Sequence, residues 1–268
     1  SAASDVYKRQ MPQFLYAEGM VPPQELFDDL QNECLRKIDA AREIAKEVAP
    51  DLEIGHTVAE GSPIDMLLGL SKDATMIVMG SRGLGGLSGM VLGSVSAAVV
   101  AHASCPVVVV REDNAVTEQT KYGPVVVGVD GSDVSVKATE VAFEEAQARG
   151  AELIAVHTYL ENQVHEPVAG AILGDASWKR FEQERREKLE QGLAPLEAKY
   201  PDVKVTKVVT QDRPVRALVD HAKEAQLLIT GSHGRGGFKG MLLGSTSRAL
   251  LQAAPCPMMV VRPERLPE

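Results

Sequence analysis

Aromatic residues and cysteines are both scarce in this chain. Only 4% of the residues are Phe, Trp or Tyr, so a hydrophobic core must be aliphatic and its strands must be rich in Val, Ile and Leu. The chain has three cysteines, Cys34, Cys105 and Cys256. No two of them form a CxxC motif, and three are too few for a disulfide framework. This cysteine usage favours a reducing, cytoplasmic location.

Long apolar runs and an excess of positive charge are also missing. No apolar stretch approaches the roughly 20 residues that a membrane helix needs, and no secretory signal is visible. The formal net charge of -9 argues against non-specific binding to nucleic acid or to anionic membranes. We therefore expect neither nucleic acid nor membrane as a partner.

Glycine, by contrast, is concentrated in two matching clusters. The stretch "GSHGRGGFKGMLLGS" (231–245) has six glycines, and "GSRGLGGLSGMVLGS" (80–94) has six in the same register. The offset of 151 residues also relates Pro63 to Pro214 and Cys105 to Cys256. Because the offset is long and constant, we interpret the chain as two copies of one domain.

The first ten residues, "SAASDVYKRQ", differ in character from the rest. Their back-translation matches an adapter used to prepare sequencing libraries, so we interpret 1–10 as translated adapter, a hypothesis that the genomic locus would test. The 151-residue offset then leaves the first copy without its first strand, first helix and second strand. We expect a truncated first domain at 11–111, a polar linker at 112–123 and a complete second domain at 124–268.

Short apolar runs alternate with helical patterns in both copies. This alternation predicts an α/β fold with two open, parallel, doubly wound sheets of the Rossmann-like kind, the first lacking its initial β-α-β. Ligands bind such sheets beyond the carboxyl ends of the strands. In the second copy we expect strands at 125–129, 152–159, 203–209, 227–230 and 257–261, and helices at about 132–150, 175–199, 213–225 and 245–254. In the first copy we expect helices at 22–48, 63–72 and 94–103, and strands at 52–58, 75–79 and 106–110.

The glycines follow the spacing Gly-x2-Gly-x9-Gly-Ser, between a strand end and a helix start. Unpaired N–H groups and the dipole at a helix start favour an anion such as phosphate, and glycines let the backbone approach it. A structural turn is the alternative reading, whereas the Walker and dinucleotide motifs do not match. Arg235 and Lys239 have no basic counterparts in the first copy and receive no role. The candidate residues are Gly80, Gly83, Gly93 and Ser94 in the first copy, and Gly231, Gly234, Gly244, Ser245 and Thr246 in the second.

With this motif present twice, the chain resembles a tandem universal stress protein of the ATP-binding branch, over nearly everything after residue 10. The resemblance implies an adenine-nucleotide alpha-hydrolase-like fold that binds ATP, with Mg²⁺ held through the phosphates. It implies Asp130 on the adenosine side, backbone of Val156 at the adenine, and the glycine loop at ribose and phosphates. The first copy has no counterpart of Asp130 or Val156, so its site should bind ATP weakly or not at all.

The histidines and carboxylates form no catalytic set that we would defend. We therefore expect a regulatory nucleotide-binding module of the stress response, with little or no ATP hydrolysis. An adenine-nucleotide hydrolase or transferase, and a protein-interaction scaffold gated by ATP, remain alternatives. In the family the last strand pairs antiparallel with that of another domain, so we expect the two domains to pair within the chain and a homodimer through the last strands to be available.

Overall fold

The computed structural model describes residues 3–9, 24–82, 92–111, 114, 118–159, 175–236 and 242–263. The chain divides into two compact units, Ser1–Leu67 and Leu68–Glu268. This division differs from the boundaries expected from the repeat, because the last two strands of the first copy lie in the same sheet as the second copy.

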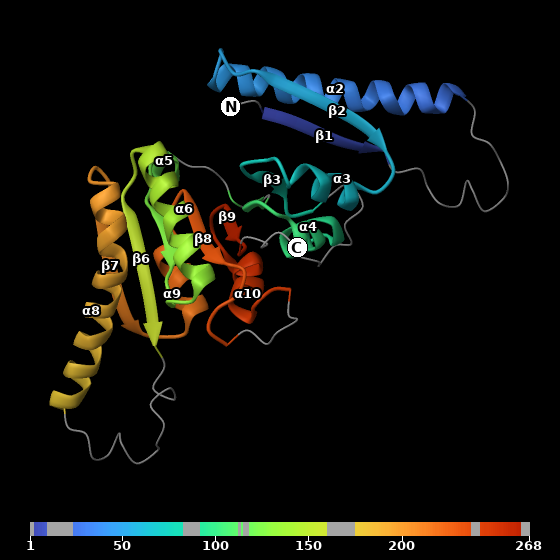
Figure 1. Ribbon diagram of the computed structural model, residues 1–268. Helices are drawn as coiled ribbons and strands as arrows, with labels where there is room; N and C mark the ends of the chain where they lie inside the picture. Colours follow the sequence, from blue (N-terminus) through green and yellow to red (C-terminus); the bar gives the residue numbers. More distant parts are fainter. Residues whose placement is uncertain are drawn as a thin grey trace. The chain divides into compact units, whose positions relative to one another are not determined.

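The first unit contains two parallel strands and a long helix. Strand β1 (Ala3–Arg9) pairs with β2 (Ile54–Glu60), and helix α2 (Gln24–Val48) lies against both strands (Figure 1). The helix is amphipathic and buries Cys34 and Ile38.

A strand at β1 corrects the expectation that the first copy has no second strand. The 151-residue offset relates β1 to β6 (Leu153–Tyr159), and both strands precede a long helix and pair in parallel with the strand that follows it. Residues such as Val6 and Tyr7 favour extended backbone, and pairing satisfies the open edge of β2. That residues 1–10 are translated adapter stays a prediction.

The second unit is built on one seven-stranded sheet with the order β3-β4-β9-β8-β5-β6-β7. Every neighbouring pair is parallel except β4 and β9, which are antiparallel with Val108 opposite Met259. The remaining strands are β3 (Ile77–Gly80), β4 (Val107–Val110), β5 (Val125–Gly128), β7 (Val205–Gln211), β8 (Leu227–Gly231) and β9 (Met258–Val261). The remaining helices are α3 (Pro63–Leu70), α4 (Ser94–His102), α5 (Glu118–Lys121), α6 (Asp133–Arg149), α8 (Asp175–Lys199), α9 (Pro214–His221) and α10 (Ser245–Ala253).

The predicted α/β, doubly wound, Rossmann-like class is confirmed, and strands of the two copies join in one sheet through an antiparallel pair of last strands. The two copies meet at the β4–β9 ladder. Each of these strands is a short valine- or methionine-rich run that would otherwise present an unpaired apolar edge.

The core is aliphatic, as the low aromatic content predicts. Val125, Val126 and Val127 of β5 are fully buried, which fits a parallel strand covered on both faces. Helices α6 and α8 cover one face, where Phe143 stacks on Tyr200 with ring centroids 5.7 Å apart. Helix α9 covers the other face, with Leu218 against Gly128. None of the helices that the structure describes is long and apolar enough to cross a membrane.

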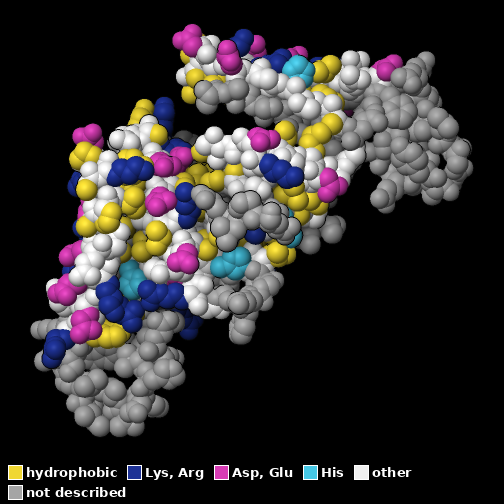
Figure 2. Space-filling view, viewed as in Figure 1, with side chains coloured by type: hydrophobic (Ala, Val, Ile, Leu, Met, Phe, Trp, Pro, Cys, Tyr) yellow, Lys and Arg dark blue, Asp and Glu magenta, His cyan; other side chains and the backbone are white. Residues whose placement is uncertain are grey.

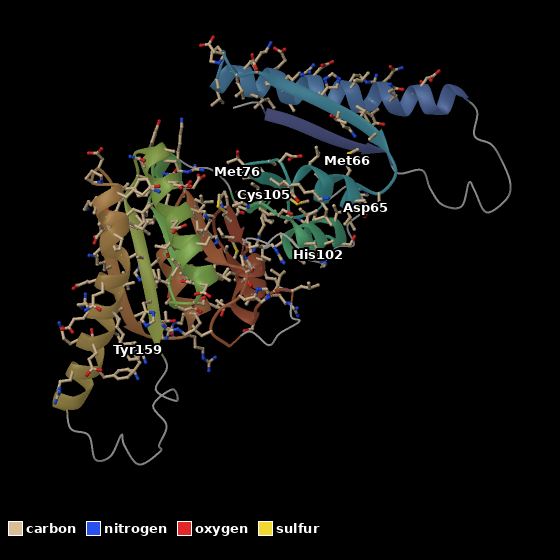
Figure 3. The ribbon with its side chains drawn as sticks, in the orientation of Figure 1. Asp65, Met66, Met76, His102, Cys105 and Tyr159 are labelled. Atoms are coloured by element: carbon tan, nitrogen blue, oxygen red, sulfur yellow. The ribbon has the colours of Figure 1, made fainter. Side chains whose placement is uncertain are left out.

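Buried thiols make a first prediction possible. Cys256 lies just before β9, where burial raises the pKa of its thiol to about 12, and burial also raises the pKa of Cys105, between α4 and β4 (Figure 3). Because the thiolate is the reactive form, we expect a thiol reagent at pH 8 to label Cys256 on the order of a thousandfold more slowly in the native chain than in denaturant. Peptide mass spectrometry resolves the sites, and equal rates in both states would contradict the buried placement.

Candidate functional site

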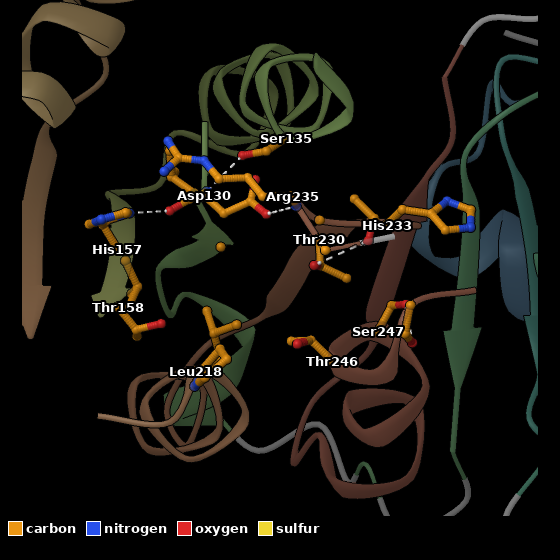
Figure 4. Close-up of a pocket in the computed structure, with 18 of the residues that line it drawn as sticks. Asp130, Ser135, His157, Thr158, Leu218, Thr230, His233, Arg235, Thr246 and Ser247 are labelled. Atoms are coloured by element: carbon orange, nitrogen blue, oxygen red, sulfur yellow. Dashed lines mark hydrogen bonds between the residues drawn. The ribbon is translucent and has the colours of Figure 1, made fainter. Parts of the chain in front are cut away.

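A cavity of about 480 Å³ lies at the carboxyl ends of β5, β6 and β8 (Figure 4). Strands β5 and β8 are neighbours in the sheet although β6 and β7 separate them in the sequence. The strand order therefore reverses at this place, which is where open α/β sheets bind ligands. The volume lies within the range of small-molecule sites.

All seven site residues predicted for the second copy line this one cavity. They come from the end of β5, from β6, from the end of β8 and from the start of α10. They are Asp130, Val156, Gly231, Gly234, Gly244, Ser245 and Thr246.

In the first copy the structure places only part of the motif. Gly80 ends β3, and Gly93 directly precedes α4, which begins at Ser94. Gly83 lies outside the described residues. The two ends of this loop meet because the Gly93 N–H donates to the Ser81 carbonyl at 2.7 Å.

Asp130 ties the end of β5 to the glycine loop. Its Oδ1 accepts hydrogen bonds from the N–H and the hydroxyl of Ser132, at 2.9 and 2.7 Å. Its Oδ2 accepts from the N–H of Arg235 at 3.0 Å. Asp130 therefore shapes the turn into α6 and also faces the cavity.

Two glycines of the motif, Gly231 and Gly234, lie where an added side chain would crowd a neighbour. A Cβ on Gly234 would approach Asp130 Oδ2 to 2.4 Å, and a Cβ on Gly231 would approach Val134 Cγ1 to 3.0 Å. A Cβ on Gly244 would stand 3.4 Å from the Ser232 carbonyl oxygen. The spacing therefore reflects close packing of the loop on β5 and α6.

The glycine loop is closed at its base by the same backbone bond in both copies, while the equivalent serines, Ser247 and Ser96, bind different carbonyls. The Gly244 N–H donates to the Ser232 carbonyl at 2.8 Å, and the Ser247 hydroxyl lies 2.9 Å from that carbonyl. In the first copy the Ser96 hydroxyl donates to the Gly80 carbonyl at 2.9 Å. The buried hydroxyl of Ser247 thus holds the base of the loop.

The start of α10 has no side-chain cap. Its N-cap is Gly244, which has no side chain to accept from the first-turn N–H groups. Ser245 and Thr246 bring hydroxyls to the same end of the cavity. This end is therefore rich in donors and suits an anion.

On the other side, β6 runs beyond the end of β5. The carbonyl of Val156 accepts from the Val129 N–H at 2.9 Å, so it is used in the sheet. Thr158 lies two residues further on, has no β5 residue opposite it, and lines the cavity. Successive residues of a strand direct their backbone N–H and C=O groups to opposite neighbours. Thr158 therefore directs these groups to the same side as Val156, past the end of β5.

His157 is a buried member of the lining that the sequence did not single out. Its Nδ1 lies 2.7 Å from the Val129 carbonyl oxygen, so the neutral ring donates from this nitrogen. Burial lowers the pKa of His157, and the positive charges of Arg185 and Arg235 lower it further.

Arg185 of α8 and Leu218 of α9 also line the cavity and were not predicted. In the sequence, only the Pro at the start of α9 could have pointed to Leu218, because it fixes where that helix begins near the sheet. Arg185 lies in the middle of a long charged helix with nothing to distinguish it from its neighbours.

Known proteins match this chain along both copies. The model of the universal stress protein family matches residues 6–111 and 121–262, the first match beginning inside the segment interpreted as adapter. A universal stress protein of Mycobacterium tuberculosis is 44% identical over 225 residues, which cover 83% of this chain and 74% of the relative. One of Mycolicibacterium smegmatis is 43% identical over 197 residues, or 74% of this chain and 65% of the relative.

Solved structures agree at the level of the fold. The match to a universal stress protein from Archaeoglobus fulgidus covers 91% of this chain and 81% of that protein, with a TM-score of 0.60 and 21% sequence identity. With the motif in both copies, the cavity at the strand ends and the two matches of the family model, the chain belongs to the universal stress protein family, in its tandem form.

Proposed function

We propose that this chain is an ATP-binding regulatory module of the stress response, with one nucleotide in the cavity of the second copy and little or no hydrolysis. The observation that carries the proposal is the convergence of the seven predicted residues on one cavity of about 480 Å³. Its position at the reversal of strand order, between β5 and β8, supports a nucleotide as the ligand.

The donor-rich end of the cavity suits the phosphates. The uncapped first turn of α10 offers N–H groups, and Ser245 and Thr246 add hydroxyls. Among the described residues, no group of three His, Cys, Asp or Glu side chains could hold a metal ion, so Mg²⁺ would be carried by the phosphates. The close packing of Gly234 and Gly244 leaves the loop backbone bare for this contact.

The opposite end suits the base. Leu218 and Pro214 supply apolar wall, and the backbone of Thr158 extends past the end of β5. Because the Val156 carbonyl is used in the sheet, we propose Thr158 rather than Val156 as the backbone that meets the adenine. Asp130 lies on the β5 side, where the ribose would pass.

Slow or absent hydrolysis is supported by the state of the candidate bases. Asp130 is the one carboxylate in the described lining, and both of its oxygens accept hydrogen bonds from the protein. His157 directs Nδ1 to the Val129 carbonyl. The one carboxylate of the described lining is thus held by the protein, while Nε2 of His157 remains an acceptor, so phosphate release is the measurement that tests slow hydrolysis.

One adenine nucleotide per chain is the expected result when the purified protein is denatured and its nucleotide is counted by chromatography. The second copy has the full set of site residues, whereas the first has no counterpart of Asp130 in the sequence. Phosphate release from added ATP and Mg²⁺ should stay near the background. Two nucleotides per chain would contradict the inactive first site, and none after addition of ATP would remove the basis of the proposal.

We further propose the domain limits 11–111 and 124–268 with a linker at 112–123, the first limit extended to residue 3 by the pairing of β1 with β2, and a cytoplasmic location. The linker contains the short helix α5, and the described cysteines are free thiols, which supports a reducing compartment. The β4–β9 register supports pairing of the two domains within the chain. Since β4 and β9 each have neighbours on both sides, a homodimer through these strands would have to break the ladder, so we do not propose it.

A further inference from the structure

Two arginines reach the β6 side of the cavity from different elements. Arg185 comes from α8, and Arg235 comes from the glycine loop. In Figure 4 the Arg235 side chain extends across Asp130 toward the side where His157 lies. Both positive charges depress the pKa of His157, which places both near that ring. Figure 2 shows Lys and Arg side chains gathered near the carboxyl end of β6.

Neither arginine has a carboxylate partner among the residues that the structure describes. The Arg185 guanidinium lies over the Phe181 ring at 4.6 Å and 6.0 Å from the centre of the Tyr159 ring. The Arg235 guanidinium lies against the bare backbone of Gly131, with Nη2 2.4 Å from where a Cβ would stand. Asp130 is on the same wall, but its oxygens already accept from Ser132 and from the Arg235 backbone.

Two other arginines of this unit have carboxylate partners on their own helix. Arg149 lies 2.7 Å from Glu145, and Arg186, the neighbour of Arg185, lies 3.7 Å from Glu182. Two guanidinium groups that line one cavity repel each other, and a bound anion relieves the repulsion that the single carboxylate of Asp130 leaves. The planar fork of arginine suits the oxygens of a phosphate in particular.

We propose that Arg185 and Arg235 form a second phosphate subsite, separate from the glycine loop, which binds a phosphate carried on the ribose 2′ or 3′ oxygen of the nucleotide. The inference rests on the proposed function. With the 5′ phosphates at the start of α10 and an uncharged base, the ribose hydroxyls are the remaining positions of a mononucleotide that can carry an anion. The site therefore favours nucleotides that are phosphorylated at both ends of the ribose.

Calorimetric titration of the nucleotide-free chain with AMP, with adenosine 2′,5′-bisphosphate and with adenosine 3′,5′-bisphosphate tests this preference. We expect the tighter of the two bisphosphates, called the bisphosphate below, to bind about tenfold more tightly than AMP, because a charge-assisted contact is gained at a partly exposed site. In Arg185→Gln and Arg235→Gln the ratio of the two affinities should fall to about one. Arg186→Gln is the matched control, because this residue is on the same helix but already paired, and its ratio should stay at the wild-type value.

The outcomes separate the two proposals. If AMP binds and the bisphosphate binds no more tightly, the second subsite is overturned while the proposed function stands. The second subsite is also overturned if the affinity ratio stays at the wild-type value in both arginine variants. It is overturned again if Arg185→Gln lowers the affinity for ATP but not for the bisphosphate, because the two arginines would then hold the terminal phosphate of ATP. If neither nucleotide nor ATP binds to the wild-type chain, the proposed function itself fails. Thermal melting confirms that each variant is folded.

Discussion

Replacing Gly234 by valine should lower the affinity for ATP by about tenfold to a hundredfold. A Cβ at this position would stand 2.4 Å from Asp130 Oδ2, so the loop must move away from β5 or the bond from the Arg235 N–H to Asp130 must break. Either movement displaces the loop that forms one wall of the cavity. Gly234 is not among the described glycines with positive φ, so the effect comes from space and not from backbone strain. Calorimetric titration with ATP measures it.

Gly192→Ala is the control for this substitution. Gly192 lies inside α8, and an added Cβ would meet no atom within 4 Å. We expect unchanged affinity for ATP and a free energy of unfolding raised by about 0.5–1 kcal/mol, because alanine is the better helix former. If Gly234→Val binds ATP like the wild type, the nucleotide does not depend on the loop geometry and the assignment of the cavity is wrong.

Gly123→Ala should produce the largest loss of stability among single-methyl additions to the described glycines. The added Cβ would stand 1.8 Å from the backbone oxygen of Glu224, and backbone cannot rotate out of the way as a side chain can. We expect the free energy of unfolding to fall by about 1–3 kcal/mol or more, which lowers the melting temperature by roughly 2–4 °C for each kcal/mol in a unit of this size. Urea denaturation followed by circular dichroism gives the free energy directly.

The matching control is Gly69→Ala in α3, where an added Cβ meets nothing within 4 Å. Its melting temperature should equal or slightly exceed that of the wild-type chain. A Gly123→Ala chain that melts like Gly69→Ala would show that the segment before β5 shifts freely, and that its contacts with Glu224 and Gln226 do not hold it.

The glycine motif could be identified from the sequence because its requirements are local. Gly231 ends a strand, Gly244 precedes a helix, and the loop packs tightly on residues near the end of β5, so the spacing alone indicates a site. The repeat offset then separates this pattern from a flexible linker. The alternation of strands and helices is local in the same sense, and it predicts the class of the fold.

The rest depends on packing between distant elements. Arg185 reaches the cavity only because α8 lies beside the end of β6, and nothing in the helix pattern distinguishes it from Arg186. Val156 was placed at the adenine by resemblance, but the ladder with β5 decides which backbone group is available. The pairing of the two copies through their last strands was expected from the resemblance alone, because strand patterns do not indicate which edges meet.

The β4–β9 ladder has a consequence for the order of events during synthesis. It pairs Val108 with Met259, so the strand that ends the first repeat acquires this neighbour only after nearly the whole second repeat has left the ribosome. Until then β4 has an open apolar edge, and pairing across such a long stretch of chain is slow. A ribosome that pauses within the second repeat would therefore hold a nascent chain with an exposed strand. Chaperone binding would matter most during this interval.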